Sequence, residues 1–273
     1  MKTELRQREN LTIMAKTTGS DLLIRALQVE GVDTVFGIAG DHILQMLDTM
    51  FDAPLRMVDF RHESGAVHAA DSYSRILKKG AVMLSTTPGH ANALPALANA
   101  IHSEAPVINI AGSAESPNLG RGAMQEFDQI NAAKPITKGA WEVPSPSRIP
   151  EYVALAFRTA LSGRQGPVHL TIPHDFQMAE VDDAEVARYT PSEYGISSLV
   201  LADPDQVEKA IDLLSTAQRP MIFAGSSAGA TAIPSEVTRL VETMRIPFFS
   251  EDSARALIPD SHCLLYTSPS PRD

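Results

Sequence analysis

The sequence predicts an α/β protein: an open, mostly parallel sheet with helices on both faces, plus the start of a second α/β domain. Short runs rich in β-branched residues alternate with helix-length segments, which is the pattern of βαβ units. Glycine-rich turns follow the apolar runs, as in "GIAGD" at 37–41. The 273 residues, 44% of them hydrophobic, are enough for one large domain or two ordinary ones.

The first helix is expected to begin at Thr18 or Ser20 and to stop at Gly31, because apolar residues recur at helical spacing between them. A strand follows in "VDTVFGIAG". The alternation then predicts helix 43–51, strand 55–59, helix 62–77, strand 81–85, helix 91–103 and strand 106–111. After an irregular section at 113–150, the first domain closes with helix 149–162 and strand 166–173. A second alternation predicts helix 204–215, strand 220–225, helix 233–244 and strand 246–249.

These elements divide the chain into an extension at 1–17, a first domain at 18–178, a linker at 179–199, an incomplete central α/β domain at 200–262 and a tail at 263–273. The second alternation stops after one or two βα units, which are too few to bury the faces of a sheet. The tail, "CLLYTSPSPRD", resembles the translated read-through of a sequencing-library adapter. We therefore expect a non-native tail that contributes nothing to the fold, on a C-terminally truncated piece of a longer protein.

Composition favours small-molecule chemistry. With a formal net charge of −10, the chain has no overall attraction to nucleic acid or anionic membranes. No run approaches the roughly 18 apolar residues of a membrane span, and the polar first residues do not form a secretory signal, so a cytoplasmic location is expected. The single cysteine, Cys263, excludes an internal disulfide framework and a cysteine-based zinc site.

The segment "VDFRHESGAVHAADSYSR", 58–75, places Glu63 between His62 and His68. A zinc hydrolase would need histidines four residues apart on one helical face. Here they are six apart, which rotates them by roughly 240°, so no metal ligand is assigned. Glu63 instead follows a strand, at the edge of a parallel sheet where ligands bind. The loops at 37–41, 86–92 and 112–126 should reach the same edge, which makes it a candidate site.

Seven motifs then appear in one order: GVDTVFG, RHE, PG-x-x-N, PVINIAG, MQEFDQ, PITK and GPVHLTIP. Over about 18–177 this order resembles the N-terminal pyrimidine-binding domain of thiamine-diphosphate enzymes, in the group of acetolactate synthase, benzaldehyde lyase and oxalyl-CoA decarboxylase. The resemblance implies a lyase or carboligase acting on a 2-oxo acid or 2-hydroxyacyl compound. It also implies a homodimer or tetramer, with Mg²⁺ and the diphosphate held by a C-terminal domain whose GDG motif is not in this sequence. For the central domain it leaves FAD, an adenine nucleotide or no cofactor as alternatives.

The resemblance also implies residue roles. Glu63 would hydrogen-bond N1′ of the aminopyrimidine and favour the tautomer that accepts the C2 proton, and Gln125 would position a substrate carbonyl. The family has glycine where Thr87 stands. The implied contacts with the cofactor are those of Gly40, Glu63, Pro88, Gly89 and Asn92.

Each role has a plainer alternative. Glu63 could pair with Arg61 or cap its helix, Gln125 could be a solvated loop amide, and Gly40 only a turn residue. His42 and His90 could shuttle protons, but histidines at helix starts more often bond to backbone.

A rival function is suggested by "GSSAG", 225–229, because it matches G-x-S-x-G and would make Ser227 a hydrolase nucleophile. Such a hydrolase needs an acid and then a histidine downstream, and only His262 follows. A glycine-rich turn is favoured instead. A further alternative is a non-catalytic binding module of the same fold.

Overall fold

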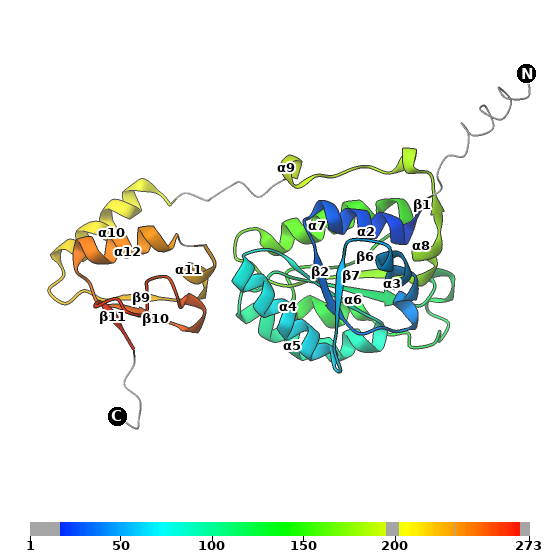
Figure 1. Cartoon of the computed structure of the whole chain (residues 1–273), viewed down its shortest axis with the longest axis horizontal. Helices are drawn as coiled ribbons and strands as arrows, with labels where there is room; N and C mark the ends of the chain where they lie inside the picture. Colours follow the sequence, from blue (N-terminus) through cyan, green and yellow to red (C-terminus); the bar gives the residue numbers. More distant parts are fainter. Residues whose placement is uncertain (1–16, 195–201, 232, 268–273) are drawn as a thin grey trace, which may run out of the picture. The chain divides into compact units, whose positions relative to one another are not determined.

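The computed structural model describes residues 17–194, 202–231 and 233–267 (Figure 1). The chain forms two compact units, divided between residues 196 and 197. Of the extension expected at 1–17, residues 1–16 lie outside the described residues, and Thr17 differs from the expectation because it belongs to strand β1.

Within residues 17–194, six parallel strands form one sheet in the order β3-β2-β4-β5-β7-β6. Their bounds are β2 Thr34–Gly37, β3 Arg56–Asp59, β4 Ala81–Ser85, β5 Val107–Ser113, β6 Ala140–Glu142 and β7 Val168–Pro173. All residues of β4, β5 and β7 are buried, as expected of parallel strands covered on both faces. The predicted fold class is confirmed.

Helices cover both faces of this sheet (Figure 1). The α-helices of the unit are α2 Gly19–Val29, α3 Leu44–Phe51, α4 Glu63–Leu77, α5 Thr87–His102, α6 Gln129–Ala133, α7 Ile149–Leu161, α8 His174–Met178 and α9 Pro191–Tyr194. Leucine, isoleucine and phenylalanine side chains pack α2 and α7 on one face, and α3 packs there through Met46 and Met50. Alanines let α4 and α5 pack closely on the other. Short 3₁₀ turns lie at η1 Asp41–Ile43, η2 Ser116–Asn118, η3 Lys134–Ile136, η4 Pro146–Arg148 and η5 Asp183–Glu185.

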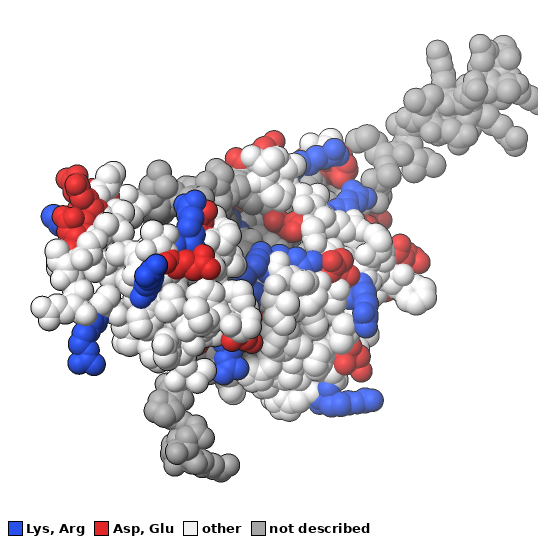
Figure 2. All heavy atoms as spheres, turned by 60° about the vertical axis from the view of Figure 1, so that its left-hand side comes forward, with Lys and Arg blue, Asp and Glu red and all other residues white. Residues whose placement is uncertain are grey.

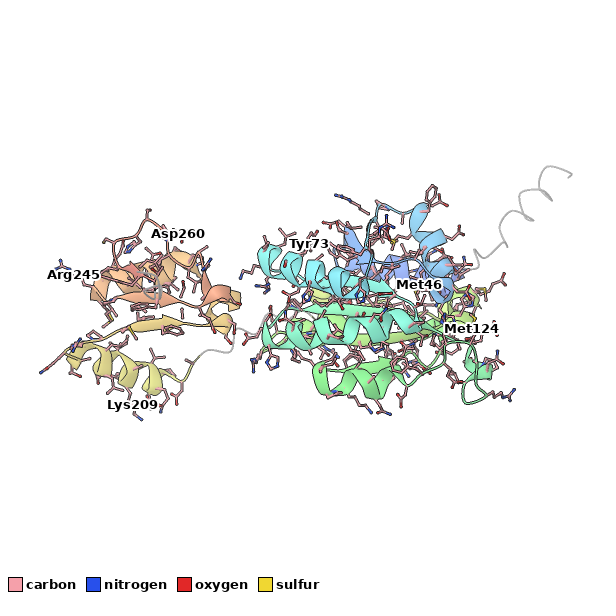
Figure 3. The ribbon with its side chains drawn as sticks, turned by 90° about the horizontal axis from the view of Figure 1, so that it is seen from below. Met46, Tyr73, Met124, Lys209, Arg245 and Asp260 are labelled. Atoms are coloured by element: carbon pink, nitrogen blue, oxygen red, sulfur yellow. The ribbon has the colours of Figure 1, made fainter. Side chains whose placement is uncertain are left out.

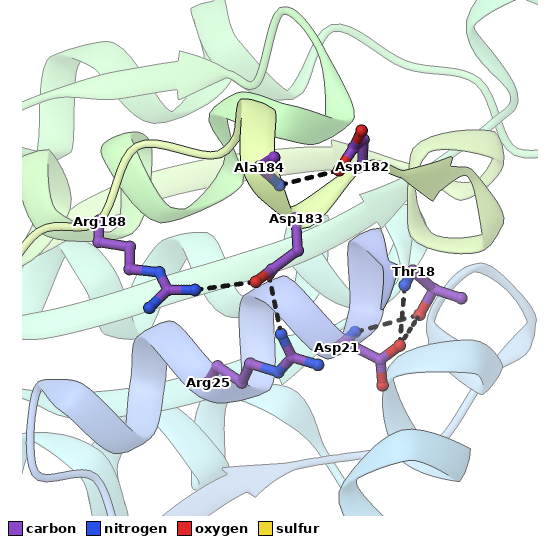
Figure 4. A network of polar contacts seen from close by, with 7 residues as sticks. All are labelled: Thr18, Asp21, Arg25, Asp182, Asp183, Ala184 and Arg188. Atoms are coloured by element: carbon purple, nitrogen blue, oxygen red, sulfur yellow. Dashed lines mark hydrogen bonds and ion pairs between the residues drawn. The ribbon is translucent and has the colours of Figure 1, made fainter. Parts of the chain in front are cut away.

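The start of α2 carries a capping box, in which Thr18 Oγ1 accepts from the Asp21 amide and the Asp21 carboxylate accepts from the Thr18 amide at 2.8 Å (Figure 4). The adjoining strand β1, Thr17–Thr18, pairs antiparallel with β8, Glu180–Val181. Thr18 was one of the two predicted caps, and the structure selects it.

The segment 179–194 differs from the linker expected there, because its first half is fixed to the unit. Beyond β8, Val186 packs against the core. The Asp183 carboxylate then accepts from Arg25 of α2 at 3.1 Å and from Arg188 at 2.8 Å (Figure 4). Residues 195–199 of the expected linker lie outside the described residues.

Among residues 202–231 and 233–267, three parallel strands form a sheet in the order β11-β10-β9. Its strands are β9 Ile222–Ala224, β10 Phe248–Ser250 and β11 Leu265–Tyr266, and its helices are α10 Pro204–Thr216, α11 Ser226–Thr231, α12 Pro234–Met244 and η6 Asp252–Ala254. Ser227 of the "GSSAG" motif therefore lies in a short helix. The His262 ring contacts the Glu242 carboxylate at 3.3 Å.

The tail at 263–273 was expected to contribute nothing to the fold, and the structure corrects this for its first residues. Leu265 and Tyr266 pair with Phe248 and Phe249 of β10. Leu264 also packs against the core of the second unit. Leu265 and Tyr266 form a short edge strand, which the composition of the tail as a whole did not predict. Residues 268–273 lie outside the described residues.

On the face drawn in Figure 2, Lys/Arg and Asp/Glu side chains are interspersed rather than gathered by sign. In the part of the chain that the structure describes, no helix is both long and apolar enough to cross a membrane.

Candidate functional site

The carboxyl edge of the six-stranded sheet collects the predicted loops, because its strands all run in the same direction. The chain leaves β2, β3, β4 and β5 there and enters η1, α4, α5 and the loop at 114–128. One boundary differs from the prediction: α5 begins at Thr87 rather than at residue 91. The segment "TTPGHAN" is thus mostly the start of a helix, with Pro88 in its first turn, where proline is well tolerated.

Glu63 is the first residue of α4, and its carboxylate points to the neighbouring helix. Oε2 accepts a hydrogen bond from Asn92 Nδ2 at 3.0 Å. Among the described residues, Oε1 has no hydrogen-bond partner, and Glu63 forms no ion pair with Arg61. The helix cap is supplied by His62, whose Nδ1 accepts from the Ser64 amide at 3.2 Å. One carboxylate oxygen is therefore fixed and the other is available to an external donor.

Gly89 lies directly beneath this available oxygen. A Cβ atom at position 89 would stand 2.7 Å from Glu63 Oε1 and 3.0 Å from Ser85 Cβ. Real Cβ atoms are essentially never that close to another heavy atom, so a larger residue at position 89 would displace the Glu63 carboxylate from this arrangement.

Gly40 lets the loop at 37–41 lie close to the start of α5, since a Cβ at position 40 would overlap Thr86 Cγ2. Four of the predicted residues thus gather around this helix start: Gly40, Glu63, Gly89 and Asn92. Pro88 is exposed in the same first turn.

Gln125 stands apart from this group. Its side chain is exposed and, among the described residues, makes no hydrogen bond. Its φ of 62° lies in the left-handed region, which is unusual for a residue other than glycine. The Glu126 carboxylate shapes this turn by accepting from the Gly120 and Ala123 amides, and these bonds lower its pKa. Figure 3 shows the adjacent Met124, 60% exposed, on this loop.

A buried polar network behind the helix start was not predicted. Asn109, in β5, places its Nδ2 at 2.8 Å from His90 Nδ1 and at 2.9 Å from His169 Nδ1. The two imidazoles stack with ring centroids 3.9 Å apart. Since an amide nitrogen only donates, both Nδ1 atoms accept and both rings carry their proton on Nε2. Burial lowers the pKa of His90 to about 4 and that of His169 well below 6.5.

Further bonds extend this network, whereas Asn109 Oδ1 is buried without a hydrogen-bond partner among the described residues. His169 Nε2 donates to Thr171 Oγ1 at 2.8 Å, and Thr171 donates to Gln129 Oε1 at 3.2 Å. His90 Nε2 contacts the Gln129 carbonyl at 3.3 Å. The signal in the sequence was a polar residue inside an otherwise apolar strand, as in "VINIAG" and "VHLTIP".

Thr87 connects this network to the site. Its Oγ1 accepts from Gln129 Nε2 at 3.0 Å, lies 3.1 Å from the Gly112 carbonyl and is 3.1 Å from His42 Nδ1. The Thr87 side chain is 1% exposed, so it faces the protein interior rather than the open edge. His42 is also buried, and burial lowers its pKa. His90 thus bonds to backbone, as the plainer alternative expects, whereas His42 bonds to the Thr87 side chain.

The cavities of the first unit include two that differ in position and lining. One, of about 530 Å³, opens at the carboxyl ends of β5, β6 and β7, beside the loop of Gln125, and includes Ser113, Phe127, Gln129 and Glu142 in its lining. Burial, and secondarily Asp175, raises the pKa of Glu142. The other, of about 400 Å³ and mostly apolar, lies between α2, α7 and residues 183–190, among elements that do not carry the predicted site.

The sequence was compared with known proteins. Residues 17–132 match the family model described as thiamine pyrophosphate enzyme, N-terminal TPP binding domain, and residues 207–269 match the model of the central domain of such enzymes. The chain is 34% identical over 251 residues to a probable acetolactate synthase large subunit of Methanocaldococcus jannaschii, covering 90% of this chain and 42% of that protein. It is 32% identical over 251 residues to oxalyl-CoA decarboxylase of Escherichia coli, with 91% and 44% covered. It is 31% identical over 261 residues to 2-hydroxyacyl-CoA lyase of Oryza sativa, with 93% and 45% covered. The chain spans about two fifths of the length of these relatives.

Proposed function

Since the chain belongs to the thiamine pyrophosphate enzyme family, we propose that its first unit is the pyrimidine-binding half of a thiamine diphosphate site in a lyase or carboligase. Thiamine diphosphate and thiamine pyrophosphate are the same compound. The observation that carries the proposal is the Glu63 carboxylate, with Oε2 bound to Asn92 and Oε1 lying unpartnered against Gly89.

These residues fit the cofactor. A carboxylate oxygen with no donor of its own is the group that a protonated ring nitrogen requires, and the bond from Asn92 orients it. The negative charge of Glu63 then favours the proton at N1′, and Gly40, Pro88 and Gly89 are proposed to line the ring. When bound, thiamine diphosphate supplies a thiazolium carbon that attacks a substrate carbonyl once it is deprotonated.

Gln125 is proposed to donate its amide to the carbonyl oxygen of the substrate. Its exposed side chain stands on the loop beside the 530 Å³ cavity, and its left-handed backbone keeps it on a tight turn. The substrate class that we propose is a 2-oxo acid or a 2-hydroxyacyl compound, in keeping with the names of the relatives.

The rest of the assembly is proposed from the family alone. Mg²⁺ and the diphosphate would be held by a further domain of the whole protein, and the complete site would form between subunits of a homodimer or tetramer. FAD or an adenine nucleotide in the central domain is an open alternative, and we propose a cytoplasmic location.

The test is Glu63→Gln in the full-length protein. The amide preserves the shape and can still accept from Asn92, but it lacks the charge that favours N1′ protonation. Exchange of the C2 proton of bound cofactor for deuterium should slow by about 10²–10⁴-fold, the usual effect of removing acid–base assistance. The control is Glu115→Gln, an exposed glutamate that bonds Asn118. Exchange at the wild-type rate in Glu63→Gln would refute the assignment.

A further inference from the structure

The start of α5 is fixed in an unusual way. Its N-cap residue, Thr86, makes no side-chain capping hydrogen bond, although such bonds normally secure the first turn. The next residue, Thr87, instead joins three other parts of the unit through one hydroxyl: η1 through His42, β5 through the Gly112 carbonyl and α6 through Gln129. The first turn of α5 is thus held from inside the protein.

This turn determines the geometry around Glu63. Gly89 and Asn92 follow Thr87 within the first two turns of α5. Asn92 donates to Oε2 of the carboxylate, and Gly89, by lacking a Cβ, leaves the space beside Oε1. The space above Gly89 is tight, since an added Cβ would approach Oε1 to 2.7 Å. A small shift of the helix start therefore changes both contacts together.

We propose that Thr87 is a positioning residue for Glu63. Its buried hydroxyl fixes the position of the first turn of α5 and thereby the orientation of the Glu63 carboxylate. This inference rests on the proposed function for its catalytic meaning, but not for its geometry. Gln129 extends the effect, because the same side chain binds Thr87 and belongs to the helix that ends the loop of Gln125.

Removing the hydroxyl has a definite consequence. In Thr87→Val the side chain keeps nearly the same shape, but one Gln129 Nε2 hydrogen and His42 Nδ1 lose a buried partner. The Gly112 carbonyl keeps its bond from Gln129 at 3.1 Å. Buried polar groups without partners are costly, so the helix start should move until water or another group satisfies them. Thr87→Ser retains the hydroxyl and should restore the position.

The first test reads the geometry without cofactor. In NMR spectra of the 273-residue chain, the Asn92 side-chain amide and the Glu63 carboxyl carbon should shift in Thr87→Val and return in Thr87→Ser. Gln129→Met removes the hydrogen bond that Gln129 Nε2 donates to Thr87 Oγ1, and it should shift the same two signals. The test thus remains decisive if Thr87→Val does not fold. The control is Thr137→Val, which removes another buried hydroxyl, bonded to the Ala133 carbonyl, and should leave them in place.

The second test measures C2 exchange in the full-length protein. Thr87→Val should slow exchange by about 10²-fold, the scale expected of a misplaced catalytic group, and Thr87→Ser should recover most of the rate. The proposal is overturned if the Asn92 and Glu63 signals do not move, if Thr137→Val moves them equally, or if exchange is unchanged although Glu63→Gln slows it. If Glu63→Gln has no effect, the proposed function fails, while the NMR result still decides the positioning.

Discussion

Acidification should destabilise the first unit through His90. Its side chain is fully buried, and its pKa in the folded protein is about 4, against an ordinary value of 6.5. The unfolded chain therefore binds a proton at a pH where the folded protein does not. The stabilisation is complete above about pH 6.5 and is lost as the pH falls toward 4. Between about pH 7.5 and about pH 5, this linkage costs roughly 2 kcal/mol of unfolding free energy.

The assay is urea denaturation followed by the fluorescence of Trp141, the single tryptophan of the chain, which lies in β6 of the first unit. His90→Asn keeps an acceptor for the Asn109 amide but cannot titrate, so its loss of stability over this pH range should be smaller by roughly 2 kcal/mol. Carboxylates and the histidines that do not contact His90 act in both proteins and cancel in the comparison. The stacked His169 does not cancel: His90 lowers its pKa, so the variant raises that pKa and the change adds in the same direction. His68→Asn, at an exposed position of α4, is the control. Equal pH dependence in wild type and His90→Asn would refute the reasoning.

Two further predictions concern packing. Gly89→Ala should push the Glu63 side chain aside and break its bond with Asn92, at a cost of about 1 kcal/mol in unfolding free energy. The NMR signal of the Asn92 side-chain amide should therefore move. In the control Gly65→Ala, the new Cβ would meet Phe60 at an ordinary 3.4 Å, and the Asn92 signal should stay in place. Deleting residues 263–273 should speed hydrogen exchange at the Phe248 amide, which donates to the Leu264 carbonyl at 2.8 Å. Unchanged protection of that amide would mean that the segment contributes nothing, as its composition indicates.

The alternation of helices and strands was readable because each element has its own periodicity. The predicted helix 62–77 differs from α4 by one residue at its start. The start of α5 was placed too late because "PG" reads as a helix breaker, although proline fits a first helical turn. Short elements failed for a different reason: β6, β8 and β11 have two or three residues each, which is too few to show a period. Tertiary pairing creates them.

Some residues of the candidate site could be predicted from the sequence and others could not. Glu63, Gly89 and Asn92 could be grouped because strand ends of a parallel sheet meet at one edge. The Asn109–His169 pair could not, since it depends on β5 lying directly beside β7, with these two residues opposite each other. The chain visits β6 between them, and the sheet places β6 outside β7. The local sequence pattern does not show that β7 rather than β6 lies beside β5, and the buried network depends on that strand order.

The antiparallel contact between β1 and β8 bears on how the protein is made. Thr17 and Thr18 are made before the rest of the described unit, but their partners Glu180 and Val181 lie near its other end. Closing so long a loop is entropically costly and comes late in folding. Until synthesis passes β8, Thr17 and Thr18 lack the strand with which they pair in the folded unit. The strand pairing that adjoins the start of α2 can thus form only after most of the unit has been made.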